Sequence, residues 1–591
     1  MILLYICTVV ALFLPQRTHQ FCTVGSPKEC LQADMAPGTN LAGEGFDITE
    51  LRRKGAFVLD MNSWKRKDKS CTLCSNLFLE KVKQKLPLSV VDWRPKQSCN
   101  HKVASTVYRS SEALVNSVSS LVENNWKSGL DLTVKDYEAK VTLAGTESKL
   151  AKSSMEKSKR DRYSFTSQQV SCEYYSYRVS SQPRLHSEFR KALKALPKTF
   201  SPQYKQRFYR LIDNFGTHYI TKVKLGGSVQ SVTSVKQCQA SLQGLNVDEV
   251  NMCLEAEASA TIKATTLNAQ GKHCKNDMDK TESKAAFSSL FNDRTTHITG
   301  GHTMEMDLLF SADKDPSAYK EWLETLPRYP DIISYSLESL HELLPTDTDV
   351  RKNLRLAISH YILERALLRN CSGNCQAGVK SNSRDPCVCQ CHNERGVNPD
   401  CCPTQRGTAR VIITVQRAEG LWGDHNTATD GFVKVIFNKQ VQYSHVIHNN
   451  NNPHWNSVVD LGTQDLSAAP KVRFEVWDED SGWDDDLLGK CEQVLTAGVK
   501  TDVCAMYHGR FFYKWEVECA PSLGGTRCTD YKATPMSQSL MSSYVSRHAH
   551  PLPRAILQKM GVYVNSRSPT TNRSQADVLP TTKLEKPRKS E

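Results

Sequence analysis

The chain has 591 residues, of which 39% are hydrophobic and 24% are charged, and it carries a formal net charge of +13. This length is too great for one compact core and predicts roughly three or four domains of ordinary globular composition. The positive charge fits an anionic partner such as a membrane surface, and it fits equally a well-solvated basic surface. No dense run of lysine and arginine indicates nucleic acid, so we expect no nucleic acid partner.

The N-terminal segment indicates secretion. Residues 2–14 are almost entirely apolar, and they are followed by Pro15 and polar residues. The run is too short to span a bilayer and is typical of a signal peptide, which we place at residues 1–20. No other stretch approaches 18 apolar residues, so the sequence predicts no membrane crossing by a single hydrophobic helix.

The cysteines indicate an oxidising compartment. One of the 21 lies in the signal segment, which leaves an even number for disulfides. Seven fall within residues 371–407, a segment with almost no apolar periodicity, and we interpret it as an EGF-like disulfide module. The alternative is a zinc site made of Cys387, Cys389, Cys391 and His392, although zinc modules usually show pairs of C-x2-C spacing.

The chain beyond this module has two parts. Residues 408–520 contain short runs of alternating hydrophobic residues separated by turn residues, which predicts an all-β sandwich. Residues 521–591 form an extension that becomes rich in Ser, Pro, Thr and Lys, and we expect a mobile tail from residue 568. Asn572 begins an Asn-Arg-Ser glycosylation acceptor in this tail.

The large segment at residues 21–370 mixes helices and strands. Two helices are predicted within residues 187–215, and a strand is predicted over residues 218–235. Gly226 and Gly227 are expected to interrupt that strand. The pair is either a bulge in a long sheet or a hinge where the sheet opens, and the sequence does not separate these alternatives.

The sharpest periodic signal spans residues 254–264. Its apolar residues alternate strictly with polar ones, and they are Leu254, Ala256, Ala258, Ala260, Ile262 and Ala264. Such a pattern over roughly 9 to 11 residues suits a strand of a transmembrane barrel. Ala, Glu and Lys nevertheless favour helix over strand. This conflict is expected of a segment that changes structure, and the alternative is a solvated sheet face beside surface helices.

Seven aspartates form two clusters in the predicted sandwich, and they are Asp424, Asp430, Asp478, Asp480, Asp484, Asp485 and Asp486. Loops at one end of a sandwich converge, so these carboxylates would repel one another unless a cation neutralised them. Hard oxygen ligands in this number select Ca²⁺. A solvated acidic turn is the alternative for either cluster alone.

Several motifs together resemble the membrane attack complex/perforin (MACPF) family. Its aromatic-Gly-Thr-His-aromatic signature is similar to Phe215, Gly216, Thr217, His218 and Tyr219. Gly226 and Gly227 stand where that family has its sheet-bend glycines. Further similar segments are 71–74, 125–131, 163–165 and 428–430, and the resemblance extends from residue 21 to about residue 531.

The resemblance implies a multidomain α+β fold. A bent, twisted antiparallel sheet would occupy residues 21–370, flanked by helical clusters at about 141–162 and 254–286. In this family the clusters unfurl into amphipathic hairpins, and the hairpins of neighbouring subunits close a β-barrel. Oligomerisation is part of that mechanism, because every backbone donor and acceptor must be paired in lipid.

The resemblance also implies disulfides, namely Cys99 with Cys172, Cys491 with Cys504 and Cys519 with Cys528. Cys253 and Cys274 bracket the second helical cluster. We expect a bond between these two cysteines to restrain the unfurling of that cluster.

Residues 408–520 resemble the calcium-binding C2 domain. The resemblance assigns the main carboxylate ligands to Asp424, Asp430, Asp478, Asp480 and Asp486, with Asp484 and Asp485 as further ligands or supporting groups. Backbone oxygens near Gly423, Thr427 and Ala428 would complete the coordination. Trp422 and Trp483 flank the carboxylates, and we expect both indoles to enter the lipid headgroup layer when calcium bridges the loops.

These features predict a secreted, calcium-dependent pore-forming protein that is not an enzyme. The resemblance implies that it would oligomerise on target-cell membranes, admit effector proteases and be stored in acidic cytolytic granules, where protonation of its ligands would weaken calcium binding. One alternative is a calcium-dependent adhesion protein without lytic activity, which the unusually polar residues 146–162 keep open. The other alternative is a calcium-dependent lipid hydrolase, for which we find no nucleophile and base. His218 could act as a base, but without such partners it is expected to be structural.

Overall fold

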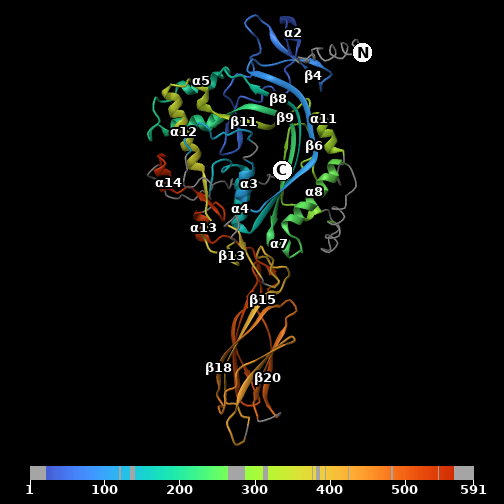
Figure 1. Ribbon diagram of the computed structural model, residues 1–591, viewed down its shortest axis with the longest axis vertical. Helices are drawn as coiled ribbons and strands as arrows, with labels where there is room; N and C mark the ends of the chain where they lie inside the picture. Colours follow the sequence, from blue (N-terminus) through green and yellow to red (C-terminus); the bar gives the residue numbers. More distant parts are fainter. Residues whose placement is uncertain are drawn as a thin grey trace, which may run out of the picture.

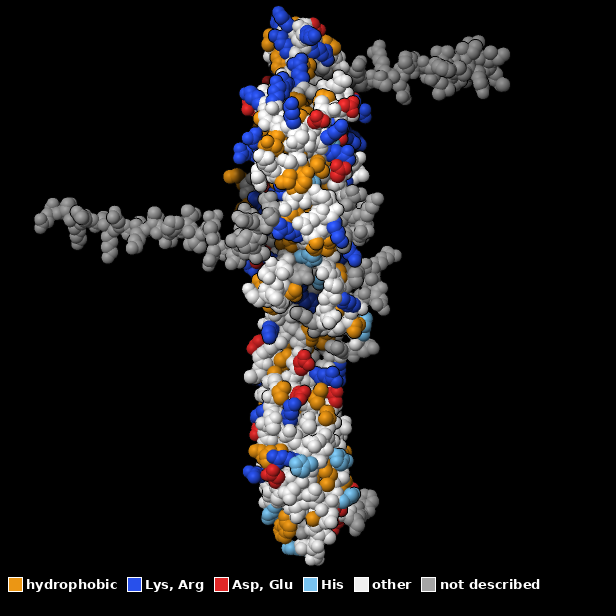
Figure 2. Space-filling view, turned by 90° about the vertical axis from the view of Figure 1, so that its left-hand side faces the viewer, with side chains coloured by type: hydrophobic (Ala, Val, Ile, Leu, Met, Phe, Trp, Pro, Cys, Tyr) orange, Lys and Arg blue, Asp and Glu red, His pale blue; other side chains and the backbone are white. Residues whose placement is uncertain are grey.

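The computed structural model describes residues 22–564 except for short internal segments, which are 119–121, 133–139, 264–273, 275–286, 311–316, 376, 381–386, 393–394, 424, 481–483 and 544. The molecule is elongated, as the ribbon view (Figure 1) and the space-filling view turned by 90° (Figure 2) both show. A large domain with a curved sheet and flanking helices lies at one end, a sandwich of strands lies at the other, and a small disulfide-rich module lies between them. The predicted signal segment and Asn572 lie outside the described residues.

Long antiparallel strands form the centre of the large domain. They are β6 (Val90–Tyr108), β8 (Tyr163–Val179) and β9 (His218–Lys236), and each pairs with the next. The other edge of β9 pairs with β11 (Asp331–Ser339) and then with β10 (Arg294–Thr299). The short strands β2 (Glu44–Asp47) and β3 (Arg52–Phe57) complete the seven-stranded sheet.

The glycine pair does not interrupt β9, contrary to our expectation, because the strand runs without a break through Gly226 and Gly227. The two residues instead mark the change of partner from β11, whose first residue Asp331 pairs with Gly226, to β10, whose last residue Thr299 pairs with Ser228. A Cβ atom on Gly226 would lie 1.8 Å from the carbonyl oxygen of Cys172 in β8. Only glycine allows the two backbones to approach so closely.

Replacing Gly226 with alanine is therefore expected to destabilise the large domain by about 3 kcal/mol or more, because a backbone carbonyl cannot move aside as a side chain can. The measurement is the yield of secreted protein together with its urea midpoint. Gly373→Ala is the matched control, since no atom lies within 4 Å of a Cβ added there. Equal stability of the two variants would contradict this account of the glycine.

Helices cover both faces and the ends of the sheet (Figure 1). The predicted helices within residues 187–215 are confirmed as α5 (Ser187–Lys194) and α6 (Lys205–Phe215). The remaining helices of this domain are α2 (Pro27–Gln32), α3 (Ser111–Val118), α4 (Lys149–Arg160), α7 (Gln237–Ser241), α8 (Val247–Lys263), α10 (Phe287–Leu290), α11 (Ala318–Thr325), the 3₁₀ helix η3 (Leu340–Leu343) and α12 (Asp349–Arg365).

A small three-stranded sheet stands at the end of the molecule away from the sandwich. It consists of β1 (Cys22–Gly25), β4 (Cys71–Asn76) and β5 (Val82–Lys85). Two disulfides hold it together, Cys22–Cys74 within the sheet and Cys30–Cys71 to α2. Such cross-links replace the large apolar core that so small a unit cannot build.

The disulfide-rich module contains the short strands β13 (Val379–Lys380) and β14 (Cys389–Gln390). Its cysteines pair as Cys371–Cys387, Cys375–Cys389 and Cys391–Cys401. The alternative of a zinc site is therefore wrong, because the cysteines it required are oxidised in pairs. A further bond from Cys402 to Cys238 ties the module to α7 of the large domain.

The sandwich consists of two four-stranded sheets. One contains β15 (Thr408–Glu419), β18 (His454–Asp465), β21 (Gly498–Ala505) and β22 (Arg510–Cys519). The other contains β16 (Gly431–Phe437), β17 (Gln440–Tyr443), β19 (Lys471–Asp478) and β20 (Asp486–Val494). Inward residues of both sheets, such as Val433, Phe474 and Phe511, are completely buried and form a single core.

The C-terminal extension returns to the large domain. After β23 (Leu523–Gly524) and β24 (Asp530–Tyr531), the hydroxyl of Tyr531 donates to Asp161 at 2.6 Å, just beyond α4. The short elements α13 (Gln538–Ser543), β25 (Ala549–Pro551) and α14 (Arg554–Lys559) follow. Strand β25 pairs with β12 (Leu367–Arg369), which also pairs with β7 (Val141–Thr142) beside α4.

Candidate functional site

Three of the predicted ligands lie at one end of the sandwich because of strand pairing. In the ladders of the second sheet, Asp478 at the end of β19 stands opposite both Gly431, the first residue of β16, and Asp486, the first residue of β20. Asp430 precedes Gly431 directly, so Asp430, Asp478 and Asp486 share this end. Strand β15 begins at Thr408 beside the disulfide-rich module and ends at Glu419, so these loops lie at the far end of the molecule (Figure 1).

The carboxylate of Asp478 lies at the centre of this group. Its side chain is only 2% exposed, and its Oδ1 accepts a hydrogen bond of 2.6 Å from the backbone N–H of Asp430. A Cβ on Gly423 would lie 1.6 Å from the other oxygen of Asp478. Glycine at this position therefore lets the loop backbone close directly over a buried carboxylate.

The side chain of Asp430 is held by the loop that contains His448 and Asn449. Its Oδ1 accepts a bond of 2.6 Å from the backbone N–H of Asn449, and its Oδ2 lies 3.2 Å from Nδ1 of His448. On the third loop, the N–H of Asp480 donates to Asp485 at 3.3 Å. Neither Asn449 nor His448 was predictable from the sequence, because both come from a loop that is neither acidic nor periodic.

These residues fit a calcium ion. The carboxylates of Asp430, Asp478 and Asp486 are hard oxygen donors from neighbouring strand ends, and the loop backbone at Gly423 leaves room for no side chain beside Asp478. Among the described residues, no three His, Cys, Asp or Glu side chains already converge closely enough to hold a metal. Asp424 and residues 481–483, including Trp483, lie outside the described residues.

Trp422 lies exposed beside these loops. Its side chain is 45% exposed, and its ring meets the rings of His425 and His508 edge-on at centroid distances of 5.0 and 4.9 Å. His508 belongs to the loop between β21 and β22, far away in sequence, so the contact was not predictable. The three rings form a polar-edged aromatic group of the kind that favours a lipid headgroup layer.

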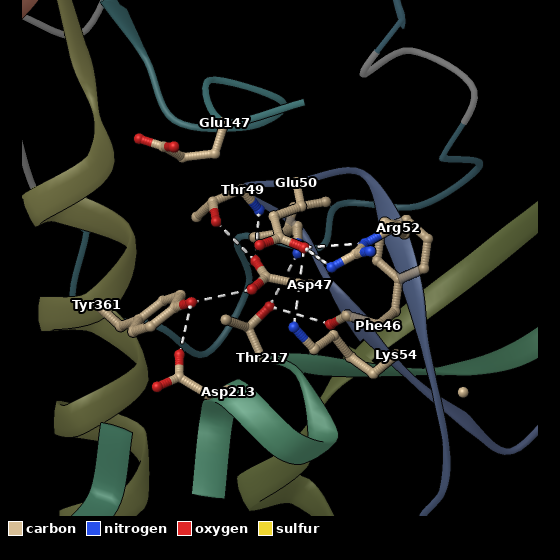
Figure 3. A network of polar contacts seen from close by, with 12 residues as sticks. Phe46, Asp47, Thr49, Glu50, Arg52, Lys54, Glu147, Asp213, Thr217 and Tyr361 are labelled. Carbon is tan, nitrogen blue, oxygen red and sulfur yellow. Dashed lines mark hydrogen bonds and ion pairs between the residues drawn. The ribbon is translucent and has the colours of Figure 1, made fainter. Parts of the chain in front are cut away.

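The Gly-Thr-His signature is buried where β9 begins. Gly216 has a φ of 84°, and a Cβ there would lie 2.5 Å from the backbone of Phe46. The hydroxyl of Thr217 accepts from the N–H of Ile48 at 3.1 Å and lies 3.2 Å from the carbonyl of Phe46. Figure 3 shows Thr217, the residue before β9, in contact with the carbonyl of Phe46 in β2.

A buried carboxylate next to Thr217 joins further elements. Asp47 accepts two bonds from Thr49, at 2.9 Å from the N–H and 2.7 Å from the hydroxyl. The hydroxyl of Tyr361 in α12 lies 3.0 Å from Asp47 and 3.2 Å from Asp213 in α6 (Figure 3). This network therefore fixes α6 and α12 against the start of the sheet.

His218 is completely buried and has a partner on each ring nitrogen. Nδ1 lies 2.8 Å from the hydroxyl of Thr217, and Nε2 lies 3.2 Å from the carbonyl of Trp126. The ring also meets the indole of Trp126 edge-on. These contacts agree with a structural histidine and leave its ring no access to a substrate.

Burial lowers the pKa of His218 to about 3, with a smaller contribution from nearby His341, although the Trp126 carbonyl opposes the shift. The folded protein therefore stabilises the neutral imidazole, and this stabilisation is complete above the ordinary pKa of about 6.5. As the pH falls below 6.5 toward 3, the unfolded chain binds a proton that the folded chain does not, and stability decreases by about 1.4 kcal/mol per pH unit.

The expected result is a loss of about 2 kcal/mol between pH 6.5 and pH 5 from His218 alone. Urea midpoints of the large domain at several pH values measure it. His218→Gln, which does not titrate, is expected to lower the stability at pH 7 but to flatten the dependence on pH. A variant that kept the wild-type slope would contradict this assignment.

The alternating segment at residues 254–264 is helical in this structure, as its propensities allow, and it forms the second half of α8; Ala264 lies outside the described residues. Its buried side chains are mostly small, and they are Leu254, Ala256, Ala258 and Thr261. The helix is also held to the sheet by polar contacts: Asn251 Oδ1 accepts from Ser105 at 2.7 Å and from Gln168 at 3.0 Å.

The first helical cluster is represented by α4. Ala151 and Met155 bury one face of this helix, and Lys157 forms an ion pair with Asp293. Residues 133–139 upstream lie outside the described residues. In the part of the chain that the structure describes, no helix is long and apolar enough to cross a membrane.

Comparison with known proteins agrees with this architecture. The MAC/Perforin domain family matches residues 35–370, the Perforin-1-like EGF domain matches residues 370–404, and the C2 domain matches residues 409–505. Perforin-1 of Mus musculus is 38% identical over 525 residues, covering 88% of this chain and 95% of that protein. Perforin-1 of Homo sapiens is 39% identical over 515 residues, covering 86% and 93%.

A solved structure of a C2 domain is 29% identical, covers 19% of this chain and 98% of that chain, and has a TM-score of 0.17. The chain is thus a multidomain protein with a bent MACPF sheet, an EGF-like disulfide module and a C-terminal C2 sandwich. It belongs to the membrane attack complex/perforin family.

Proposed function

We propose that this protein is a secreted, calcium-dependent pore-forming cytolysin. Its C2 domain binds lipid through Asp430, Asp478, Asp480 and the acidic residues 484–486, with Asp424 and the backbone near residues 423, 427 and 428. Bound calcium offsets the negative charge of these loops, and Trp422 and Trp483 then enter the headgroup layer. The protein is not an enzyme in this proposal, and its partners are the target membrane and further copies of itself.

The observation that carries the proposal is the placement of α8. A segment with the alternating pattern of a membrane strand follows β9, the longest strand of the sheet together with β6, and it is stored as a helix whose buried side chains are mostly small. Strand β10 follows the same segment and pairs with β9. If α8 and its continuation extend these two strands, they form one long hairpin, and hairpins from neighbouring subunits close a barrel in which all backbone groups are paired.

The relatives support the same function, because two proteins named Perforin-1 match nearly their whole length. By the same analogy the pore admits effector proteases into the target cell, and the protein is stored in cytolytic granules. Acid storage would keep it inactive, since protonated carboxylates do not bind calcium.

Dye release from liposomes of neutral lipid tests the proposal. Small and protein-sized dyes are enclosed together, and release is followed with calcium and with a chelator. Release of both dyes only with calcium is the expected result. Calcium-dependent binding without release would support the second candidate, an adhesion protein, for which the polar face of α4 is the favouring observation.

A further inference from the structure

The two cysteines of the Cys253–Cys274 disulfide are equally far in sequence from the end of the ladder between β9 and β10. That ladder is regular, and it pairs Thr233 with Arg294 at the end where the two strands lead into the helical segment. Cys253 lies twenty residues after Thr233, and Cys274 lies twenty residues before Arg294. If both strands continue in the same antiparallel register, each further residue of β9 pairs with the preceding residue of the β10 strand. The two cysteines then stand directly opposite each other.

The spacing of the two cysteines suits both forms of the segment. Their Cα atoms are 5.6 Å apart in the helical form. Directly opposite residues in antiparallel strands are about 4.5 to 5.5 Å apart. The bond can therefore persist while the segment changes from helix to hairpin.

The chain already uses this kind of cross-link elsewhere. Cys99 stands opposite Cys172 in the ladder of β6 and β8, and the two are bonded. Cys22 stands opposite Cys74 in the ladder of β1 and β4, and these are bonded as well. A disulfide across paired antiparallel strands is thus an established element of this fold.

We propose that the Cys253–Cys274 bond stays intact during insertion and becomes a cross-strand staple at the base of the membrane-spanning part of the second hairpin. This proposal rests on the pore-forming function proposed above, and it fixes the register of the hairpin. It also reverses the expectation from the sequence that the bond restrains the unfurling.

The lengths on either side of the bond agree with that position. Ten residues follow Cys253 up to Lys263, and ten precede Cys274 down to Ala264, which is the number that a transmembrane strand needs, roughly 9 to 11. The twenty residues between the ladder and the bond span about 66 Å when extended, at about 3.3 Å per residue. By the same measure β15, which runs along the sandwich, spans about 40 Å. The extension is therefore longer than β15, which agrees with a bond that lies near the membrane surface.

In this register the middle of the disulfide loop pairs like with like, whereas Leu254 stands opposite His273 and Ile262 opposite Thr265. The order of residues places Ala258 opposite Ala269 and Ala260 opposite Leu267, all on one face. It places Glu255 opposite Lys272 on the other face, where opposite charges stabilise a cross-strand pair. A shift by one residue in either direction would set Ala258 and Ala260 opposite polar residues.

The first hairpin gives an independent estimate of how far the tip of the second hairpin reaches into the membrane. The ladder of β6 and β8 ends at Tyr108 opposite Phe165, and its unslipped extension places Leu132 opposite Val141, with the tip between residues 136 and 137. The ladder of β8 and β9 pairs Tyr163 with Lys236. If these two strands also continue without a slip, residue 137 stands opposite Ile262, because each lies 26 residues further along its strand. The two tips therefore differ by one residue in depth. This extension requires Trp126 to leave His218.

The first test maps disulfides in wild-type pores isolated from liposomes after dye release. Non-reducing digestion and mass spectrometry are expected to find the peptide that joins Cys253 to Cys274. Finding the two peptides separate, or a need for reductant before release, would overturn the proposal. A faster release by the C253S/C274S double variant would overturn it too, because the bond would then act as a restraint.

The second test moves the bond by two steps in the C253S/C274S background. E255C with K272C is in register, whereas E255C with Q270C is the matched variant out of register. Oxidation after pore assembly is expected to cross-link the first pair and not the second. Cross-linking of the second pair, or of neither, would overturn the proposed register. Absence of dye release from the wild-type protein would instead contradict the proposed function.

Discussion

Replacing Asp478 with asparagine is expected to abolish calcium-dependent binding to liposomes and, with it, dye release. The substitution keeps the shape of the side chain and an oxygen that accepts the N–H of Asp430, so the sandwich should stay folded. It removes one charge from the only described candidate ligand that is almost fully buried, at 2% exposure. Supporting partners of metal ligands already change affinity by about 10- to 100-fold, so loss of a ligand should reach at least that range.

Calcium titration of liposome binding measures the effect, with circular dichroism as the test of folding. Asp460→Asn is the matched control, because Asp460 carries the same charge in the same domain but is paired with Arg410 at 2.9 Å in the middle of β18 and β15. Equal calcium dependence of both variants would show that the convergent aspartates are not the binding site.

Much of this site was predictable because the residue types alone, two clusters of aspartate, indicate its chemistry. Two clusters of aspartate at the ends of alternating hydrophobic runs predict converging acidic loops. Strand pairing does bring Asp430, Asp478 and Asp486 to one end of the second sheet. The contacts of His448 and His508 were not predictable, since histidine in a turn has no periodicity and its neighbours come from distant loops.

The fold of the large domain shows a similar division. The helices near residues 187–215 follow from apolar periodicity, which is local information. The uninterrupted path of β9 through Gly226 and Gly227 does not, because glycine signals a close approach without naming the partner. That partner is the carbonyl of Cys172, more than fifty residues away in the sequence.

The alternating segment is the most instructive case. Its sequence carries a strand pattern and helix propensities at once, and the structure satisfies the propensities. The first half of α8 packs Val247, Val250 and Leu254 into a hydrophobic cluster. The half after Leu254 buries the small side chains of Ala256, Ala258 and Thr261, so this half loses little apolar contact when it leaves the sheet. The pattern then has its proper environment only in a lipid bilayer, where one face of each strand meets hydrocarbon.

Replacing Ala260 with arginine is expected to abolish dye release while leaving calcium-dependent binding unchanged. Ala260 belongs to the apolar row of the alternating segment, and it is half-buried on α8. Arginine on the lipid face of a barrel costs about 2 to 4 kcal/mol at the bilayer midplane. Each 1.4 kcal/mol is a factor of about ten, and every subunit of a ring carries the same substitution, so insertion should fail.

Ser259→Arg provides the matched control. Ser259 is adjacent on α8 and is also half-buried, so the two arginines should disturb the soluble protein to a similar degree. In a strand, neighbouring side chains point to opposite faces, so arginine at residue 259 faces the aqueous lumen and release should persist. Loss of release from both variants would indicate damage to the helix, and release from both would mean that the segment does not enter the membrane as a strand. Opposite effects on dye release from arginine at two adjacent, similarly buried residues of one helix are expected only if the segment enters lipid as an alternating strand.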